Sequence, residues 1–313
     1  MIAPPPMAVL TVLLAGLLDV AFGEPPNAVH PVAWLGSLIA FLERRGPRDR
    51  PRAELAYGVV VVVAATGAAA LAAVGVSFAV ARLPWWLALP LGAVALKVSF
   101  SLRGLVGAGR YVQRTLDGDA DAAREGLRAL VSRDRDLTVP QVASAAIESL
   151  AENLSDSVVA PLLYYAFFGL AGAFVYRAVN TLDAMIGYHG RYEHLGKPAA
   201  RLDDLANLLP ARLTGLLLVA LAFGRRTGAA AFEALRRQRR LSSSPNKLWT
   251  IAPMAGALRV QLAKPGSYTV GRGDRPLCAE VIGEAAAIVW VAGAIALAAA
   301  ALLAGLLAAI VWR

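Results

Sequence analysis

The sequence is poor in several residues and motifs on which common enzyme classes depend. It contains one cysteine, Cys278, and three histidines in 313 residues. A single cysteine excludes a disulfide within the chain and a cysteine-based metal site, and we interpret Cys278 as a small packing residue. A Gly-x-Ser-x-Gly nucleophile elbow and a His-Glu-x-x-His zinc motif are also missing. The sequence therefore lacks the signatures of a serine hydrolase and of a zinc peptidase.

Two glycine-containing stretches imitate nucleotide-binding loops but are incomplete. Residues 190–197 resemble a P-loop, yet one residue too many separates the glycines, and Pro198 replaces the Ser or Thr that would meet Mg²⁺. Gly271 and Gly273 lack the third glycine and the preceding strand of a dinucleotide fingerprint. The sequence also shows no internal or inverted repeat of the kind common in transporters.

The chain carries an excess of positive charge, with a formal net charge of +9. Basic and aromatic residues are not interleaved, so we expect no nucleic-acid partner. The basic residues gather in 44–52, 103–135 and 225–275, which the positive-inside rule places in the cytoplasm. The first apolar run has no basic segment before it and ends on Asp19 rather than on a cleavage site. We therefore expect that run to remain in the mature protein.

Long apolar runs dominate the composition, which is 58% hydrophobic. A helix needs roughly 20 apolar residues to cross a hydrocarbon core of about 30 Å. The runs that meet this length are 7–22, 55–80, 84–100 and 281–311. Two others, 157–176 and 213–223, are predicted to re-enter the membrane or to pack within the bundle. Otherwise the two most polar motif regions would face opposite sides of the membrane, and ATP is available on only one side.

These runs predict an all-α, multi-pass integral protein of the cell (inner) membrane. Apolar stretches of Ala, Leu and Val without turn-bounded alternation give little indication of strands. We expect one membrane-embedded enzyme domain spanning 1–313. It would comprise an N-terminal helical membrane region (1–102), a polar middle that bears the motifs (103–280) and a C-terminal anchor helix (281–313).

The first polar constellation consists of Glu148, Glu152, Asn153 and Asp156. Spacings of four and eight residues place the three carboxylates on one helix face, where they repel one another unless a cation lies between them. Such a face is typical of a site for Mg²⁺ or for an amine, because Mg²⁺ takes oxygen ligands. The alternative is a solvated face on which Ser155 or Asp156 caps the next helix. An apolar run follows directly, and this favours a functional site.

A second constellation lies between the two short apolar runs. Its members are Asn180, Asp183, Arg201, Asp203, Asp204 and Asn207. Asp203 and Asn207 are one helical turn apart, and Asp204 lies on the neighbouring face. Arg201 and Arg212 offer planar forks that suit phosphate or carboxylate. This set is typical of a metal–nucleotide site, and helix capping with ion pairing is the alternative.

A third constellation surrounds the end of the first apolar run. Asp19 lies within that run, where an ionisable group is costly and indicates function. Gly23 and the prolines after it interrupt the helix. His30 precedes Pro31 and is a candidate base or ligand, with a hydrogen-bonded structural role as the alternative.

These residues belong to longer motifs that resemble the cobinamide-phosphate synthases of cobalamin biosynthesis. The motifs are LLDVAFGEPPNAVHPVAWLG (17–36), VSRD (131–134), AAIESLAENLSDSVVAPLLY (145–164), VNTLDAMIGY (179–188), ARLDDLANLLPARLT (200–214), SPN (244–246) and MAGAL (254–258). They cover nearly the whole chain in order. The chain departs from the family pattern at Glu24, Leu154 and Ser157, and at the residues from Lys247 onward. The departure after SPN affects substrate positioning in that loop more than the reaction.

The resemblance implies an ATP-dependent ligase that joins aminopropanol or its phosphate to the carboxylate of adenosylcobyric acid. It implies ATP and Mg²⁺ as cofactors, a corrinoid as substrate and a cytoplasmic catalytic face. The lipid bilayer and other membrane-bound cobalamin enzymes are the expected partners. The residues predicted to be catalytic are Glu148, Glu152, Asp156, Asp203, Asp204 and His30. Those predicted to bind substrate are Asp19, Asn153, Asn180, Asp183, Arg201, Asn207, Arg212, Ser244 and Asn246. The predicted Mg²⁺ ligands are Glu152, Asp156 and Asp204.

The competing hypothesis is a transporter or channel with a polar path through the membrane. Asp19 and Lys97, both within apolar runs, are its main support. The asymmetric distribution of polar motifs along the chain argues against it. A lipid phosphotransferase is a third hypothesis, but its paired Asp-Gly/Ala-Arg signature is missing.

Overall fold

A computed structural model of the chain describes residues 4–128, 137–188, 190–273 and 275–311. Helices make up most of this part, and several are long and apolar, which confirms the predicted fold class. Its only sheet is a short antiparallel hairpin of β1 (Leu262–Lys264) and β2 (Tyr268–Val270). Leu262 pairs with Val270 in this hairpin. The chain forms two compact units.

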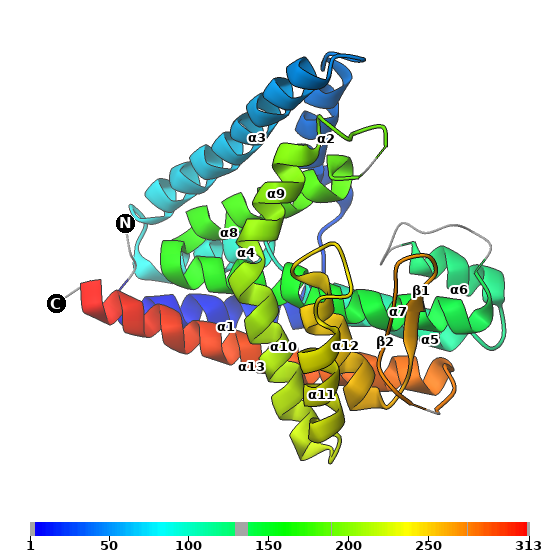
Figure 1. Cartoon of the computed structure of the whole chain (residues 1–313). Helices are drawn as coiled ribbons and strands as arrows, with labels where there is room; N and C mark the ends of the chain where they lie inside the picture. Colours follow the sequence, from blue (N-terminus) through cyan, green and yellow to red (C-terminus); the bar gives the residue numbers. More distant parts are fainter. Residues whose placement is uncertain (1–3, 129–136, 189, 274, 312–313) are drawn as a thin grey trace. The chain divides into compact units, whose positions relative to one another are not determined.

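The first unit contains Met1–Ser101, Ala160–Ala206 and Ala296–Arg313. Its elements are α1 (Pro5–Phe22), the 3₁₀ turn η1 (Asn27–Val29), α2 (Pro31–Arg44), α3 (Pro51–Val80), α4 (Trp85–Lys97), α8 (Ala160–Ile186), α9 (Lys197–Ala206) and the second half of α13 (Ala279–Val311) (Figure 1). Proline begins α1, α2 and α3, because its fixed φ suits the first helical position, where no amide donor is needed. Within this unit α3 packs on α8 and α1 packs on α4.

The second unit contains Leu102–Val159 and Asn207–Ile295. Its elements are α5 (Leu102–Thr115), α6 (Ala120–Leu127), α7 (Val139–Leu154), the π-helix η2 (Ser155–Val159), α10 (Leu208–Gly224), α11 (Gly228–Gln238), α12 (Lys247–Leu258), the β1–β2 hairpin and the start of α13. Thr138 and Gln141 form a capping box at the start of α7. Helices α11 and α12 lie side by side (Figure 1). Gly256 permits this approach, since a Cβ there would lie 2.5 Å from the Ala231 Cα.

The predicted membrane-spanning runs form long apolar helices. Five helices of the described part have the length and composition needed to cross a membrane, or six if the bent pair of α9 and α10 is counted as one span. Runs 7–22, 55–80, 84–100 and 281–311 fall in helices of this set, as predicted. Helix α10 contains the run 213–223 and has 17 residues. At about 1.5 Å per residue it is short for a complete crossing.

The run 157–176 reverses direction within the first unit. Gly169 interrupts α8 with φ 63° and ψ −153°, a conformation open almost only to glycine. The rings of Tyr164 and Tyr176 stack with centroids 5.1 Å apart, although 12 residues of straight helix would separate their backbones by about 18 Å. A Cβ on Gly172 would lie 2.3 Å from the Tyr164 carbonyl oxygen. The two arms of α8 therefore double back on each other. Helix Val139–Ile186, which contains this run, is also one of the five long and apolar enough to cross a membrane, so re-entry of the run stays a prediction.

Candidate functional site

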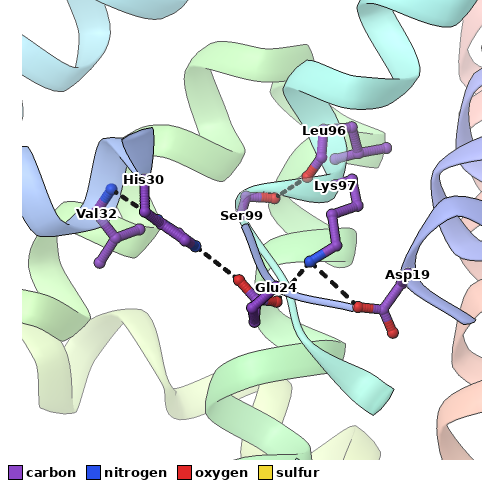
Figure 2. A network of polar contacts seen from close by, with 7 residues as sticks. All are labelled: Asp19, Glu24, His30, Val32, Leu96, Lys97 and Ser99. Atoms are coloured by element: carbon purple, nitrogen blue, oxygen red, sulfur yellow. Dashed lines mark hydrogen bonds and ion pairs between the residues drawn. The ribbon is translucent and has the colours of Figure 1, made fainter. Parts of the chain in front are cut away.

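The first unit contains a buried polar network around Lys97 (Figure 2). The Lys97 ammonium lies 3.4 Å from Asp19 Oδ1 and 2.5 Å from Glu24 Oε1. On the other side of Glu24, His30 Nε2 lies 2.6 Å from Oε2. Asp19 and His30, both predicted to be site residues, are thus linked through Lys97 and Glu24, which were not among the predicted site residues.

The hydrogen bonds of His30 fix its tautomer. The Val32 backbone amide donates to His30 Nδ1 at 3.1 Å, which caps the start of α2. Since Nδ1 accepts, Nε2 carries the proton and donates to the Glu24 carboxylate. No lone pair of the ring remains for a substrate proton, so the geometry gives His30 a structural task. Its predicted catalytic role stays a prediction.

Charge balance holds the network in place despite its burial. The Asp19 side chain is 0% exposed and that of Lys97 is 7% exposed. Burial by itself would raise the pKa of Glu24, but hydrogen bonds from Lys97, His30 and Ser101 lower that pKa below its ordinary value. The pairing of Asp19 with Lys97 has a signal in the sequence. Asp19 is the only charged residue of run 7–22, and Lys97, of opposite sign, is the only charged residue of run 84–100.

An apolar cavity of about 910 Å³ adjoins this network within the first unit. Side chains from α1 to α4 and from α8 line it, among them Phe22, Trp34, Leu38 and Leu91. Glu24, Lys97, Ser99 and Arg177 supply its polar wall. The buried charges therefore border an apolar space rather than a polar path.

The remaining predicted residues of this unit lie on α8 and α9, which pack together. Arg177 Nη1 donates to Asn180 Oδ1 at 3.3 Å. Arg201 is exposed, whereas the Asp203 Oδ1 atom is buried. Asp183 lies near the end of α8, and Asp204 lies on α9 beside Asp203.

In the second unit, Glu148 fastens the hairpin to α7. Its buried carboxylate accepts from the Tyr268 hydroxyl at 2.7 Å and from the Ser144 hydroxyl at 2.8 Å. The Ala263 amide in turn donates to Ser144 Oγ at 2.9 Å. Both Glu148 oxygens are thus engaged in holding β1 and β2, a role that the sequence did not predict. Catalysis by Glu148 stays a prediction.

The ammonium of Lys247, the first residue of α12, lies at the acidic face where the sequence predicts Mg²⁺ or an amine ligand. Its Nζ lies 3.0 Å from Glu152 Oε1. The Glu152 charge raises the pKa of Lys247 most strongly, with further contributions from Asp156 and Glu148, and these outweigh the lowering by burial. Lys247 therefore offsets one of the three negative charges on the predicted acidic face.

The π-helix η2 carries Asp156 out of the regular register of α7. Single π turns inside α-helices occur frequently at functional sites. The Ser155 hydroxyl is buried here, with no hydrogen-bond partner among the residues that the structure describes. Asn153 Nδ2 donates to the Ser149 carbonyl of its own helix.

The described ranges contain no group of three or more His, Cys, Asp or Glu side chains that could hold a metal ion. Glu152 and Asp156 belong to the second unit and Asp204 to the first. Ligation of Mg²⁺ by these three residues stays a prediction.

Two arginines, Arg212 and Arg239, lie against the ring of Trp249. They are near the acidic face, because Arg212 contacts Asn246 and the next residue, Lys247, contacts Glu152. Arg212 Nη1 donates to Asn246 Oδ1 at 2.6 Å. The guanidinium of Arg212 lies 4.8 Å from the Trp249 ring centroid, and that of Arg239 lies 5.6 Å from it. These contacts orient an arginine fork that suits phosphate or carboxylate.

Three of the predicted substrate-binding residues thus meet in one place. Ser244 Oγ accepts from the Asn246 amide at 3.3 Å, which shapes the loop before α12, and Asn246 in turn accepts from Arg212. Asn207 is buried at the start of α10. Sequence reasoning missed Lys247, Trp249 and Arg239, although the density of arginines before residue 244 was a signal. The VSRD motif at 131–134 lies outside the described residues.

Comparisons with known proteins agree with the sequence resemblance. The profile of the family described as "CobD/Cbib protein" matches residues 12–298. "Cobalamin biosynthesis protein CobD" of Dehalococcoides mccartyi (strain CBDB1) is 41% identical over 297 residues, which cover 90% of this chain and 94% of the relative. "Probable cobalamin biosynthesis protein CobD" of Pyrococcus furiosus is 42% identical over 265 residues, or 83% of this chain and 86% of the relative. No solved structure matches the chain.

Proposed function

This chain belongs to the CobD/Cbib protein family of cobalamin biosynthesis, and from that premise we propose that it catalyses an ATP-dependent amide ligation. The amine is aminopropanol or its phosphate, and the acid is the free carboxylate of adenosylcobyric acid. The new bond joins the amine nitrogen to the carboxyl carbon. We assign this chemistry to the second unit, where α7, η2, α10 and α12 bring acids and arginines together.

The observation that supports the proposal best is the contact between an ammonium group and the Glu152 carboxylate near the end of α7. An amine substrate arrives as an ammonium ion and must lose a proton before its nitrogen can attack. Glu152 holds the Lys247 ammonium at 3.0 Å, and the charge of Asp156 also acts on it. Because Glu148 is engaged by the hairpin, we assign Glu152 and Asp156 to the substrate ammonium and its proton.

The arginines near Trp249 complete the chemistry that the ligation needs. When bound, ATP would supply the phosphoryl group that activates the corrinoid carboxylate, so that ADP and phosphate would be the products released with the amide. Arg212, oriented by Asn246 and Trp249, would stabilise the negative charge on the transferred phosphoryl group. The described carboxylates form no metal cage, so we derive no step through a protein-bound Mg²⁺.

Charge supports a cytoplasmic location for this chemistry. Arg236 and Arg237 end α11, and the loop after it is also basic, as expected for a cytoplasmic region. The transporter hypothesis loses its main support, because Asp19 and Lys97 neutralise each other beside an apolar cavity.

The decisive experiment supplies the purified, detergent-solubilised protein with adenosylcobyric acid, ATP and either amine. We expect one ADP and one amide per turnover, detected by mass spectrometry. Asp156→Asn should lower the rate by about 10²- to 10⁴-fold, the usual contribution of a general acid or base. Asp121→Asn on the exposed face of α6 is the matched control and should leave the rate unchanged. Amide formation without ATP, or full activity of Asp156→Asn, would contradict the proposal.

A further inference from the structure

The second unit contains a pocket of about 350 Å³ at the place where α10 and α12 end and α13 begins. Its main lining residues are Arg225, Thr227, Leu258, Arg259, Arg275 and Glu284. We propose that this pocket binds the phosphate headgroup of an anionic membrane lipid.

The lining charges favour an anion. Arg225 Nη2 lies 2.8 Å from Glu284 Oε2, and Arg275 Nη2 lies 2.5 Å from Glu284 Oε1. The Glu284 carboxylate therefore orients two guanidinium groups. The exposed Glu280 lies 3.8 Å from Arg275 Nη2, so two carboxylates stand against three arginines. The Arg259 side chain is exposed and forms no hydrogen bond or ion pair with any residue in the described ranges. Arginine forks that are oriented and incompletely neutralised match the oxygens of a phosphate group.

The position of the pocket along the chain matches the headgroup level of a membrane. Arg225 follows directly after the last apolar residues of α10. Glu284 lies in the second turn of α13, immediately before an apolar stretch that continues to Val311. An apolar segment thus ends, and another begins, at the pocket. Basic pockets at the cytoplasmic ends of membrane helices attract anionic headgroups.

The pocket is separate from the candidate ligation site. Lys247 begins α12 and Leu258 ends it, 11 residues later. A rise of about 1.5 Å per residue places the two ends about 16 Å apart. The apolar stretches of α10 and α13 that adjoin the pocket suit the acyl portion of a lipid, which a free phosphate ion lacks.

The test measures lipid-induced thermal stabilisation of the detergent-purified full chain. Solubilised phosphatidylglycerol, phosphatidylcholine and inorganic phosphate are titrated in parallel at equal concentrations. We expect a saturable rise in Tm with phosphatidylglycerol only, because phosphatidylcholine cancels its phosphate charge and inorganic phosphate lacks an apolar anchor. Arg259→Gln should raise the midpoint of this titration about tenfold. Arg272→Gln, which removes an exposed arginine outside the pocket, should change it less than twofold.

Three outcomes would overturn the proposal. Equal midpoints for wild type and Arg259→Gln would show that the lipid binds elsewhere. Equal stabilisation by inorganic phosphate would identify a site for soluble anions. Absence of any stabilisation by phosphatidylglycerol would show that the pocket does not bind this class of lipid. Melting temperatures without lipid provide the folding control, since Arg259 has no partner to lose.

Discussion

Replacement of Lys97 by Met tests whether the buried network stabilises the first unit. Methionine fills a similar volume but removes the ammonium that neutralises Asp19 and Glu24. At 3.4 Å from Asp19, and with an effective dielectric constant of about 20, the lost attraction is roughly 5 kcal/mol. Removal of one partner from a buried ion pair costs about 3–5 kcal/mol in practice. Glu24 is 34% exposed, so solvent reduces its share of this loss.

The assay is equilibrium unfolding of the purified protein in mixed micelles, followed by circular dichroism. Lys97→Met should lower the free energy of unfolding by about 3–5 kcal/mol. The double variant Asp19→Asn/Lys97→Met should recover much of the loss, because it no longer buries an uncompensated carboxylate at position 19. A loss below about 1 kcal/mol, the range of exposed pairs, would refute the reasoning. The reasoning would also be refuted if the double variant lost as much free energy of unfolding as the two single variants together.

Four further predictions concern other features of both units. Tyr268→Phe removes a hydrogen bond to the buried carboxylate of α7 and should cost about 1–3 kcal/mol in equilibrium unfolding, with faster proteolysis of the hairpin. Gly169→Ala forces a side chain into a glycine-only conformation and should cost about 1–3 kcal/mol. Gly67→Ala, which meets no atom within 4 Å, should cost nothing. Arg212→Lys keeps the charge but loses the planar fork that Asn246 and Trp249 orient, so the ligation rate should fall on the order of tenfold. The lowered pKa of Glu24 contributes stability above pH 4.5 that is lost as the pH falls through the folded-state pKa. An acid titration of Tm should therefore fall less steeply in Glu24→Gln than in wild type.

The helical periodicity and apolar length of the sequence were enough to predict the fold class and the four long runs. Helical spacing also predicted a cation at the acidic face of Glu148, Glu152 and Asp156, and the structure places the Lys247 ammonium against Glu152. That cation could not be identified, because Lys247 follows 95 positions after Glu152, and periodicity carries no information about contacts at that separation. For the same reason Glu148 could not be separated from Glu152, since its task depends on Tyr268 in a hairpin far along the chain.

The network around Lys97 also depends on contacts between distant residues, which the sequence could not predict. Asp19 was recognised because a charge within an apolar run is costly wherever it lies. Glu24 lies in the Gly- and Pro-containing stretch that ends the first helix, so its sequence context predicts no role for its carboxylate. Only the folded chain shows that Glu24 joins Lys97 to His30. His30 was read as a candidate base because a sequence does not reveal which ring nitrogen is already engaged.

The reversal of α8 at Gly169 has a consequence for biogenesis. A straight crossing would require the insertion machinery to carry the charged residues after Ile186 through the bilayer. A hairpin that doubles back can enter as one element and leave both of its polar flanks where they were synthesised. Such a hairpin would add no crossing, so each later segment would keep the orientation set by the residues before it. Counting apolar stretches alone would invert the assigned orientation of every loop that follows, including the arginine-rich loop after α11.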